Sequence, residues 1–345
     1  MSKQTRPVYL EVNLSQLRRN IEAIRAHVAP AKVMPMIKAN AYGHGMDGVA
    51  PFIEPFVDYL GVAILEEGIR LRELGITKPI LVAGGTLPEQ VPYFAEYDLT
   101  LTGSSIELLD SAEKASQNAG KRIKTHLKID TGMERVGVRE YEAEALIRKS
   151  AACSHIDVEG IYTHFANSES ADRGDARRQL ERFQEVLDID RKLSIPVPPI
   201  RHVCNSGGIL NLPEAHFDMV RPGILFYGVY PGSEVDRVVD VKPAVTWHAK
   251  VSYSKRTRPG RSVSYGALWQ AEVETRIVTV PCGYADGYFR RMTNRAQVII
   301  RGNGDRPDSR RMCQSHFGHN DTDPLSWIPV LGRIDAPLLD NVIGE

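Results

Sequence analysis

Residues 33–45 have the sequence VMPMIKANAYGHG, in which a short apolar run leads into a polar turn with two glycines. The run Val33–Ile37 has the length and composition of a buried strand. A helix is expected before it, because apolar residues recur at helical spacing between Leu17 and Val28, after a capping Asn13 or Ser15. The stretch is therefore one repeat of a strand-and-helix pattern, with a lysine at the end of the strand.

The same pattern continues for roughly 210 residues, which is the size and repeat number of a (β/α)8 barrel of the TIM type. A doubly wound sheet is the alternative, but the Gly-rich fingerprint that such sheets usually carry at the first turn is absent. We therefore predict an α/β fold with an N-terminal barrel. The eight predicted strands are Val33–Ile37, Tyr59–Ile64, Pro79–Ala83, Leu99–Leu101, Ile123–Ile129, Val158–Thr163, Arg201–Cys204 and Phe217–Val220. The clearest helices are Glu66–Leu74, Ile106–Ser116, Glu142–Arg148 and Asp175–Lys192.

From about Pro243 the pattern changes to short alternating runs, such as Val245–Val251 and Thr275–Val280. Alternation with a period of two predicts strands. We therefore divide the chain into a barrel over residues 1–238 and a C-terminal, mostly-β domain over residues 239–345. The segment from Gly302 to His319 is polar and lacks a clear period, which predicts a loop.

Composition excludes several classes of protein. The 43 Lys and Arg residues balance 43 Asp and Glu residues, so the net charge is zero. A neutral chain lacks the basic surface that nucleic acids or anionic membranes attract, and no partner of either kind is expected. The four cysteines are far apart, which argues against structural zinc and a disulfide framework, and no metal is expected. The N-terminus has no apolar signal segment, so we expect a cytoplasmic protein.

Lys38 stands where a barrel presents its catalytic groups, at the carboxyl end of a strand. Partial burial there lowers the pKa of a lysine and makes its amine nucleophilic, although a solvated lysine also fits the position alone. Residues 36–45 resemble the pyridoxal-phosphate lysine motif of the alanine racemase family, and the likeness extends from about residue 8 to about residue 301. This resemblance implies that Lys38 holds pyridoxal 5'-phosphate as an internal aldimine and acts as the base on one face of the substrate Cα.

Tyr265 lies in the sequence SVSYG at residues 262–266. Racemisation removes a proton from one face of Cα and returns it to the other, so a second base is needed. A phenol serves as that base when nearby cations lower its pKa. The resemblance assigns this role to Tyr265. In the family this tyrosine comes from the partner subunit, which implies a homodimer with shared active sites.

Two further motifs follow predicted strands. Arg135 lies in the sequence KIDTGMERVG at residues 128–137, where its guanidinium can donate hydrogen bonds to the cofactor oxygen and to a substrate carboxylate. A surface arginine paired with Asp130 or Glu134 is the alternative. His164 resembles the family histidine that stacks near the cofactor ring and contacts Arg221.

The loops after the seventh and eighth strands often bind phosphate in barrels. The resemblance assigns the cofactor phosphate to Ser206, Gly223 and Ile224 in these loops, together with Tyr42. It also places Arg221 against the pyridine nitrogen. Because an arginine does not give up its proton, this nitrogen should stay unprotonated. The weaker electron sink should then favour return of the proton to Cα.

The C-terminal part departs from the family pattern. Aligned without a gap, Met312 takes the place of the family methionine whose backbone N–H binds the substrate carboxylate, and Cys313 replaces an aspartate. No tyrosine follows Tyr288, whereas the family usually has a late one that reaches the phosphate. These differences leave room for a chain that binds the cofactor with impaired catalysis.

The resemblance implies an alanine racemase that interconverts L-alanine and D-alanine by a two-base mechanism and supplies D-alanine for peptidoglycan. A racemase of another small amino acid, such as serine, remains open. A decarboxylase of basic amino acids shares the cofactor and domain types, but its catalytic cysteine and carboxylates have no counterpart here. A non-catalytic cofactor-binding protein is usually a lone barrel, so Tyr265 and the β domain argue against it.

Overall fold

The computed structural model describes residues 6–189, 192, 194–195, 198–300, 308–311 and 332–334. The contacts between residues divide the chain into two compact units. Residues Asn13–Ala244 form one, which we call the α/β unit. Residues Met1–Val12 and Val245–Glu345 form the other, which we call the strand unit.

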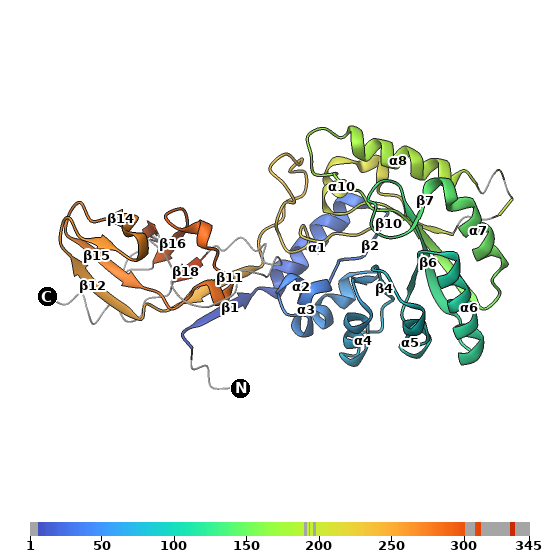
Figure 1. Ribbon diagram of the computed structural model, residues 1–345, viewed down its shortest axis with the longest axis horizontal. Helices are drawn as coiled ribbons and strands as arrows, with labels where there is room; N and C mark the ends of the chain where they lie inside the picture. The colour runs from blue at the N-terminus through green and yellow to red at the C-terminus, as the bar shows by residue number, and fades with distance from the viewer. Residues whose placement is uncertain are drawn as a thin grey trace. The chain divides into compact units, whose positions relative to one another are not determined.

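The α/β unit alternates strands and helices, as the sequence pattern predicts (Figure 1). Its first helix begins after Asn13, whose side chain accepts the Gln16 N–H at 2.9 Å. The strands are β2 (Lys32–Val33), β3 (Leu60–Val62), β4 (Ile80–Val82), β5 (Leu101–Gly103), β6 (Ile123–Asp130), β7 (Val138–Arg139), β8 (Ile156–Tyr162), β9 (Ile200–His202) and β10 (Met219–Val220). The helices are α1 (Leu14–Val28), α2 (Lys38–Tyr42), α3 (Met46–Ile53), α4 (Leu65–Glu73), α5 (Val91–Glu96), α6 (Ile106–Ala119), α7 (Ala143–Ala152), α8 (Gly174–Leu187) and α10 (Ser206–Asn211).

Neighbouring strands of the α/β unit run parallel. β5, β6, β8 and β9 form one continuous path, β3 pairs with β4, and β10 pairs with β2. Single bridges link Met36 to Gly61 and Leu81 to Thr100. Parallel pairing brings the carboxyl ends of these strands to the same edge, which is where polar groups from different repeats can meet.

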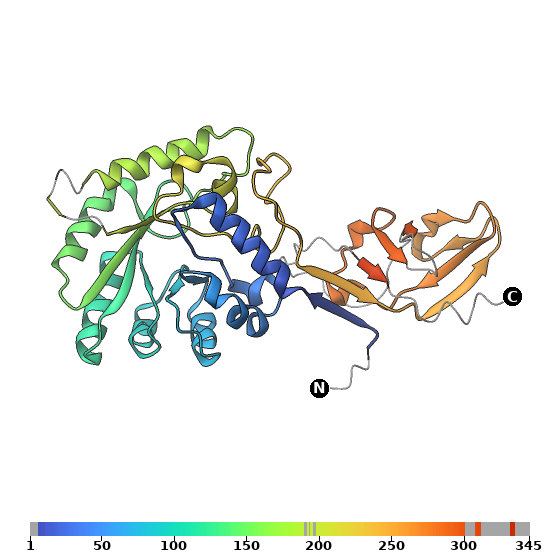
Figure 2. The same ribbon diagram turned by 180° about the vertical axis from the view of Figure 1, so that it is seen from behind.

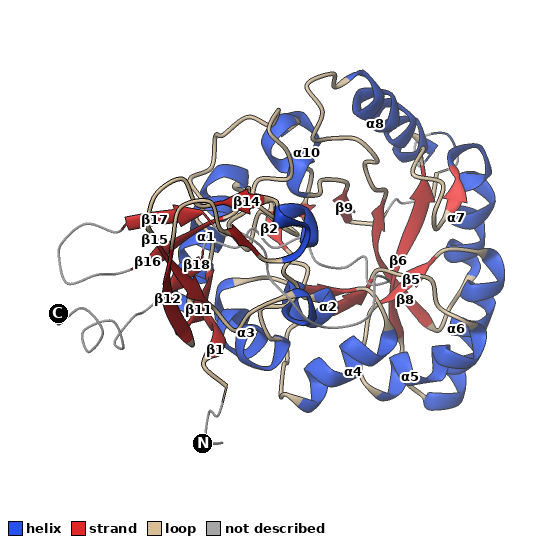
Figure 3. Cartoon of the chain, turned by 60° about the vertical axis from the view of Figure 1, so that its left-hand side comes forward, coloured by secondary structure: helices blue, strands red, loops and turns tan. Residues whose placement is uncertain are grey.

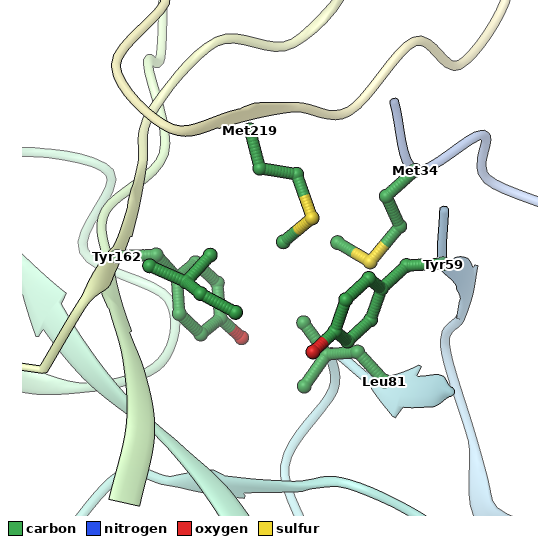
Figure 4. Packing of buried hydrophobic residues seen from close by; sticks show 6 residues of the cluster. Met34, Tyr59, Leu81, Tyr162 and Met219 are labelled. Atoms are coloured by element: carbon green, nitrogen blue, oxygen red, sulfur yellow. The ribbon is translucent and has the colours of Figure 1, made fainter. Parts of the chain in front are cut away.

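Helices α4 to α8 lie around the outside of the strands (Figure 3), and Figure 2 shows the unit from behind, with α1 in dark blue. On the inside, large side chains from several strands and strand ends point toward one another (Figure 4). The interior is therefore a packed core rather than a channel. This core consists of Met34, Tyr59, Leu81, Tyr162, Ile200 and Met219.

The strand unit begins with the first strand of the chain. β1 (Val8–Val12) pairs antiparallel with β11 (Val245–Ala249), from Val8 opposite Ala249 to Val12 opposite Val245. This pairing is the reason that residues 1–12 group with the C-terminal part, whereas the sequence placed them in the barrel domain. A local run of residues does not show which distant strand it will pair with.

The other strands of this unit are β12 (Tyr253–Thr257), β13 (Ser262–Val263), β14 (Trp269–Gln270), β15 (Thr275–Thr279), β16 (Gln297–Ile300), β17 (Asp308–Arg311) and β18 (Gly332–Ile334). The prediction of a continuous loop from Gly302 to His319 was wrong at Asp308–Arg311. These residues pair antiparallel with β16, so backbone pairing outweighs their polar composition. None of the described helices is long and apolar enough to cross a membrane.

Candidate functional site

The short element α2 (Lys38–Tyr42) has a left-handed backbone and is a turn rather than a regular α-helix. Four successive residues, Ala39 to Tyr42, have φ angles of 52°, 53°, 56° and 51°. This conformation costs about 1–2 kcal/mol for each residue with a side chain. Glu67 offsets part of the cost, because its carboxylate accepts the Ala39 N–H at 2.6 Å and the Ala63 N–H at 2.8 Å. The backbone after Lys38 is thus held in a fixed, strained shape of the kind found at functional sites.

Lys38 begins this turn and is half-buried. Burial lowers the pKa of its amine, the positive charge of Arg135 lowers it further, and the Glu67 carboxylate opposes both effects. The Nζ atom lies 5.9 Å from the centre of the Tyr42 ring. A larger share of neutral amine at physiological pH is what a nucleophilic lysine needs.

Tyr42, Ser206 and Gly223 meet beside this lysine. A Cβ atom placed on Gly223 would lie 2.8 Å from the Tyr42 hydroxyl and 3.8 Å from Ser206 Oγ. Ser206 Oγ accepts the Gly223 N–H at 3.0 Å and the Leu225 N–H at 3.2 Å. Two hydroxyls and the turn at Gly223 therefore form a cradle that a side chain would fill. Such a cradle fits a phosphate group within reach of the same turn as Lys38.

Arg221 follows β10 and is only 3% exposed. Its guanidinium donates to His202 Nδ1 at 2.7 Å, to the Thr163 carbonyl at 2.7 Å and to the Val203 carbonyl at 2.9 Å. His164 Nδ1 lies 3.2 Å from the same guanidinium. Burial lowers the pKa of Arg221 to about 10, so the group stays protonated at neutral pH. It is a fixed cation at the carboxyl ends of the strands.

His164 is the imidazole that the sequence singled out after β8. Burial lowers its pKa well below the ordinary histidine value, and the charges of Arg221, Lys128, Arg135 and Lys38 act in the same direction. The ring is therefore neutral at physiological pH. A neutral ring beside Arg221 can accept a hydrogen bond and pack against another flat group.

Arg135 is carried by a loop that Asp130 organises. The Asp130 carboxylate accepts four backbone N–H groups, those of Gly132, Met133, Glu134 and Arg135, at 2.8 to 3.1 Å. Burial favours the protonated acid, but these four bonds outweigh it and lower the pKa of Asp130. Asp130 thus shapes the backbone around Arg135, while Glu134 pairs with Arg139 at 2.9 Å. The sequence left open a salt bridge from the Arg135 side chain to Asp130 or Glu134. In the structure, Asp130 instead binds backbone N–H groups and Glu134 pairs with Arg139.

The sequence reasoning missed three residues of this site. Lys128 is 4% exposed, and burial together with the charge of Arg221 lowers its pKa well below the ordinary value. Its Nζ lies 4.8 Å from the centre of the Tyr162 ring, and that ring stacks on His202 at 4.6 Å. Their position in the sequence could have indicated them, because Lys128, Tyr162 and His202 lie at or near the ends of predicted strands.

The structure thus brings Lys38, Tyr42, Ser206, Arg221 and Gly223 together in the α/β unit, with His164 against Arg221. Ile224 follows Gly223 in the same turn. Tyr265 belongs to the strand unit, where it begins the turn between β13 and β14. Met312 lies outside the described residues. Among the residues that the structure describes, no group of three or more His, Cys, Asp or Glu side chains is placed to hold a metal.

A half-buried lysine amine, two hydroxyls beside Gly223 and a buried guanidinium at the strand ends are groups with which an α/β enzyme can hold a phosphorylated cofactor. Comparison with known proteins gives the family. Residues 12–231 match the description "Alanine racemase, N-terminal domain", and residues 244–311 match "Alanine racemase, C-terminal domain".

Individual relatives agree with these matches. The alanine racemase of Carboxydothermus hydrogenoformans is 44% identical over 86% of this chain and 81% of its own length. A solved alanine racemase from Clostridium difficile is 33% identical, with a TM-score of 0.79 over 92% of this chain and 86% of that one. A Bartonella henselae alanine racemase, solved with covalently bound pyridoxal phosphate, is 26% identical, with a TM-score of 0.75 over 85% of this chain and 80% of that one. The chain belongs to the alanine racemase family.

Proposed function

We propose that this chain is an isomerase that interconverts L-alanine and D-alanine with pyridoxal 5'-phosphate, and so supplies D-alanine for peptidoglycan. One observation carries the proposal: half-buried Lys38 shares its turn with Tyr42, whose hydroxyl lies beside Gly223 and Ser206 from two other parts of the chain. A lysine and a phosphate cradle side by side are the two attachment points that this cofactor needs. Family membership gives the substrate, since the relatives are alanine racemases.

The α/β unit is proposed to be a closed (β/α)8 barrel. Besides the strand pairs, the Asp218 N–H donates to the Arg201 carbonyl at 3.0 Å, which links the residues before β10 to β9. β10 in turn pairs with β2. These bonds support a ring of β2, β3, β4, β5, β6, β8, β9 and β10, with β7 paired to β6 outside it. The domain boundary between residues 238 and 239 and the cytoplasmic location remain predictions from the sequence.

The residues of the cradle would hold the phosphate, Lys38 would bind the cofactor covalently, and Arg221 would face its ring nitrogen. Arg221 suits this place because its other hydrogen bonds already fix the guanidinium. When bound, the cofactor withdraws electrons from Cα and makes its proton acidic. Lys38 then removes or returns that proton on one face, since its lowered pKa lets it cycle between amine and ammonium. Arg135 and the backbone of Met312 are proposed to bind the substrate carboxylate.

The opposite face requires Tyr265, which we propose comes from a second copy of the chain in a homodimer. Exposure of the strand unit supports this: Tyr265 is 63% exposed, and Leu268 and Val273, which follow it, are 63% and 66% exposed. Large apolar side chains exposed within a short stretch of chain support a surface that a partner covers.

The test is the formation of D-alanine from L-alanine by the purified chain with added pyridoxal phosphate. Tyr265→Phe removes only the hydroxyl, and we expect kcat to fall by about a hundredfold or more. Tyr253→Phe is the matched control, because Tyr253 is a 59% exposed tyrosine of the same unit. Its rate should stay within about twofold of the original. Cofactor binding without turnover in the unaltered chain would contradict the proposal.

A further inference from the structure

A line of hydrogen bonds runs from Arg221 into the core of the α/β unit. Arg221 Nη1 lies 2.7 Å from His202 Nδ1, and His202 Nε2 lies 2.8 Å from His126 Nδ1. His126 Nε2 lies 3.3 Å from the carboxylate of Glu159. Both imidazoles are fully buried. The line therefore joins the guanidinium at the strand ends to a carboxylate that is 18% exposed, through two fully buried imidazoles.

The two ends of the line fix the direction of every hydrogen bond in it. A guanidinium only donates and a carboxylate only accepts. His202 must therefore accept at Nδ1 and donate from Nε2, and His126 must do the same. Both rings are then neutral with the proton on Nε2. Burial lowers the pKa of both histidines, and this agrees with the neutral forms that the geometry requires.

The backbone around Glu159 is shaped for this contact. The register between β6 and β8 shifts from Thr125 opposite Val158 to His126 opposite Gly160, so Glu159 lies at a bulge. Bulges turn a side chain out of the normal alternation of a strand. A Cβ atom on Gly160 would lie 2.5 Å from His126 Nδ1, so only glycine leaves room for the ring.

Two of the core tyrosines drawn in Figure 4, Tyr59 and Tyr162, contact members of this line. Tyr162 stacks on His202 with an interplanar angle of 8°, and the Tyr59 hydroxyl donates to Glu159 at 3.0 Å. Tyr59 thus makes a second hydrogen bond to the carboxylate without taking part in the line. It provides a way to disturb Glu159 that leaves the histidines connected.

Arg221 needs a distant carboxylate because its immediate partners are neutral. Among the described residues, its side chain bonds to two backbone carbonyls and two imidazole nitrogens. A buried cation is costly unless an opposite charge compensates it. We propose that Glu159 is a positioning residue for Arg221: through His126 and His202, its carboxylate fixes the hydrogen bonds that hold the guanidinium in place.

The proposal makes a direct prediction for the ring nitrogens, which does not depend on the proposed function. In the full chain with ¹⁵N-labelled histidine, nuclear magnetic resonance should show His126 and His202 as single Nε2–H tautomers, with and without pyridoxal phosphate. Glu159→Leu removes the acceptor, and the two rings should then exchange between tautomers. A proton on Nδ1 of either ring in the unaltered chain, or unchanged ring signals in Glu159→Leu, would overturn the proposal.

The kinetic arm rests on the proposed function. Glu159→Leu should lower kcat about tenfold to a hundredfold with little change in KM for alanine, as for the loss of a hydrogen bond to a charged group. Glu159→Gln keeps the shape but can present an N–H instead of an oxygen, so we expect a smaller loss of about fivefold. Tyr59→Phe is the control and should stay within about twofold.

Two kinetic results would contradict the proposal: full kcat in Glu159→Leu, or an equal loss in Tyr59→Phe. Each variant is compared with the unaltered chain by thermal unfolding, so that a fall in kcat is read only from folded protein. If the unaltered chain has no racemase activity, the proposed function fails. The tautomers of His126 and His202, measured by nuclear magnetic resonance, would then still test whether Glu159 positions Arg221.

Discussion

Lys38 and Tyr265 are the two proposed bases, and their surroundings differ in kind. Lys38 is half-buried, its turn is held by Glu67, and its pKa is lowered inside its own unit. Tyr265 is 63% exposed and begins a turn in which Ala267, like Ser264 before it, has a positive φ angle. The α/β unit thus builds the environment of its base from its own residues. The strand unit places its base on an exposed turn, so most of the surface of that side chain faces solvent in the single chain.

Removal of the Lys38 amine should have the largest effect. Lys38→Ala should lower kcat at least about a thousandfold and abolish covalent retention of the cofactor, because both need the same nitrogen. The measurements are D-alanine formation and cofactor absorbance after gel filtration. Lys114→Ala changes an exposed lysine of α6 and should alter neither. Retention of more than a tenth of the rate in Lys38→Ala would show that Lys38 is not the base.

Mixing two inactive variants tests whether the bases come from different copies. If sites are shared, a dimer of one Lys38→Ala chain and one Tyr265→Phe chain has one intact site. Random mixing makes half of the dimers mixed, so about a quarter of the original activity should return. The chains are unfolded together, refolded with cofactor and assayed. No recovery would mean that Tyr265 serves the Lys38 of its own chain.

Asp130→Asn tests the loop that carries Arg135. One oxygen becomes an NH₂ group that faces the Arg135 N–H, so we expect the free energy of unfolding to fall by about 2 kcal/mol at pH 7. The folded pKa of Asp130 lies below its ordinary value of 3.8. Its stabilisation is therefore complete above that value and is lost as the pH falls through the folded pKa.

Urea unfolding of both proteins at several pH values measures this effect. The difference between them should be constant from about pH 5 upward and should shrink below pH 4. Asp157→Asn, an exposed position in β8, serves as the control. A difference that grows as the pH falls would rule out this role for Asp130.

The smallest effect is a shift in pH dependence. Burial lowers the pKa of Lys38 first and the charge of Arg135 second, so Arg135→Gln should raise the pKa toward the ordinary lysine value. The pH at which the cofactor-free protein reaches half its maximal rate of pyridoxal phosphate uptake should then increase. Arg139→Gln removes a charge from the same region and should not move the profile, since Arg139 pairs with Glu134. A shift of the Arg135→Gln profile to lower pH would contradict the prediction, because loss of a nearby cation should raise the pKa of Lys38.

The parts of the fold that could be predicted are those that depend on the spacing of apolar residues within a short stretch of sequence. The strand at Ile123–Ile129 and the helix at Ile106–Ser116 follow from apolar runs and helical spacing, and both are present as β6 and α6. Asn13 was one of two predicted caps, and its side chain does cap α1. The strand at Asp308–Arg311 escaped prediction because its residues are polar, and its partner β16 decides its conformation.

The sequence by itself determined the repeating strand and helix pattern, which places Lys38, His164 and Arg221 directly after predicted strands. These features are local, since they depend on spacing within one repeat. Only the tertiary structure decided that β1 joins the C-terminal strands, that Glu67 holds the turn after Lys38, and that Glu159 connects to Arg221. The physical reason is that strand pairing and buried hydrogen bonds join residues far apart in the chain, and no local pattern records their partners.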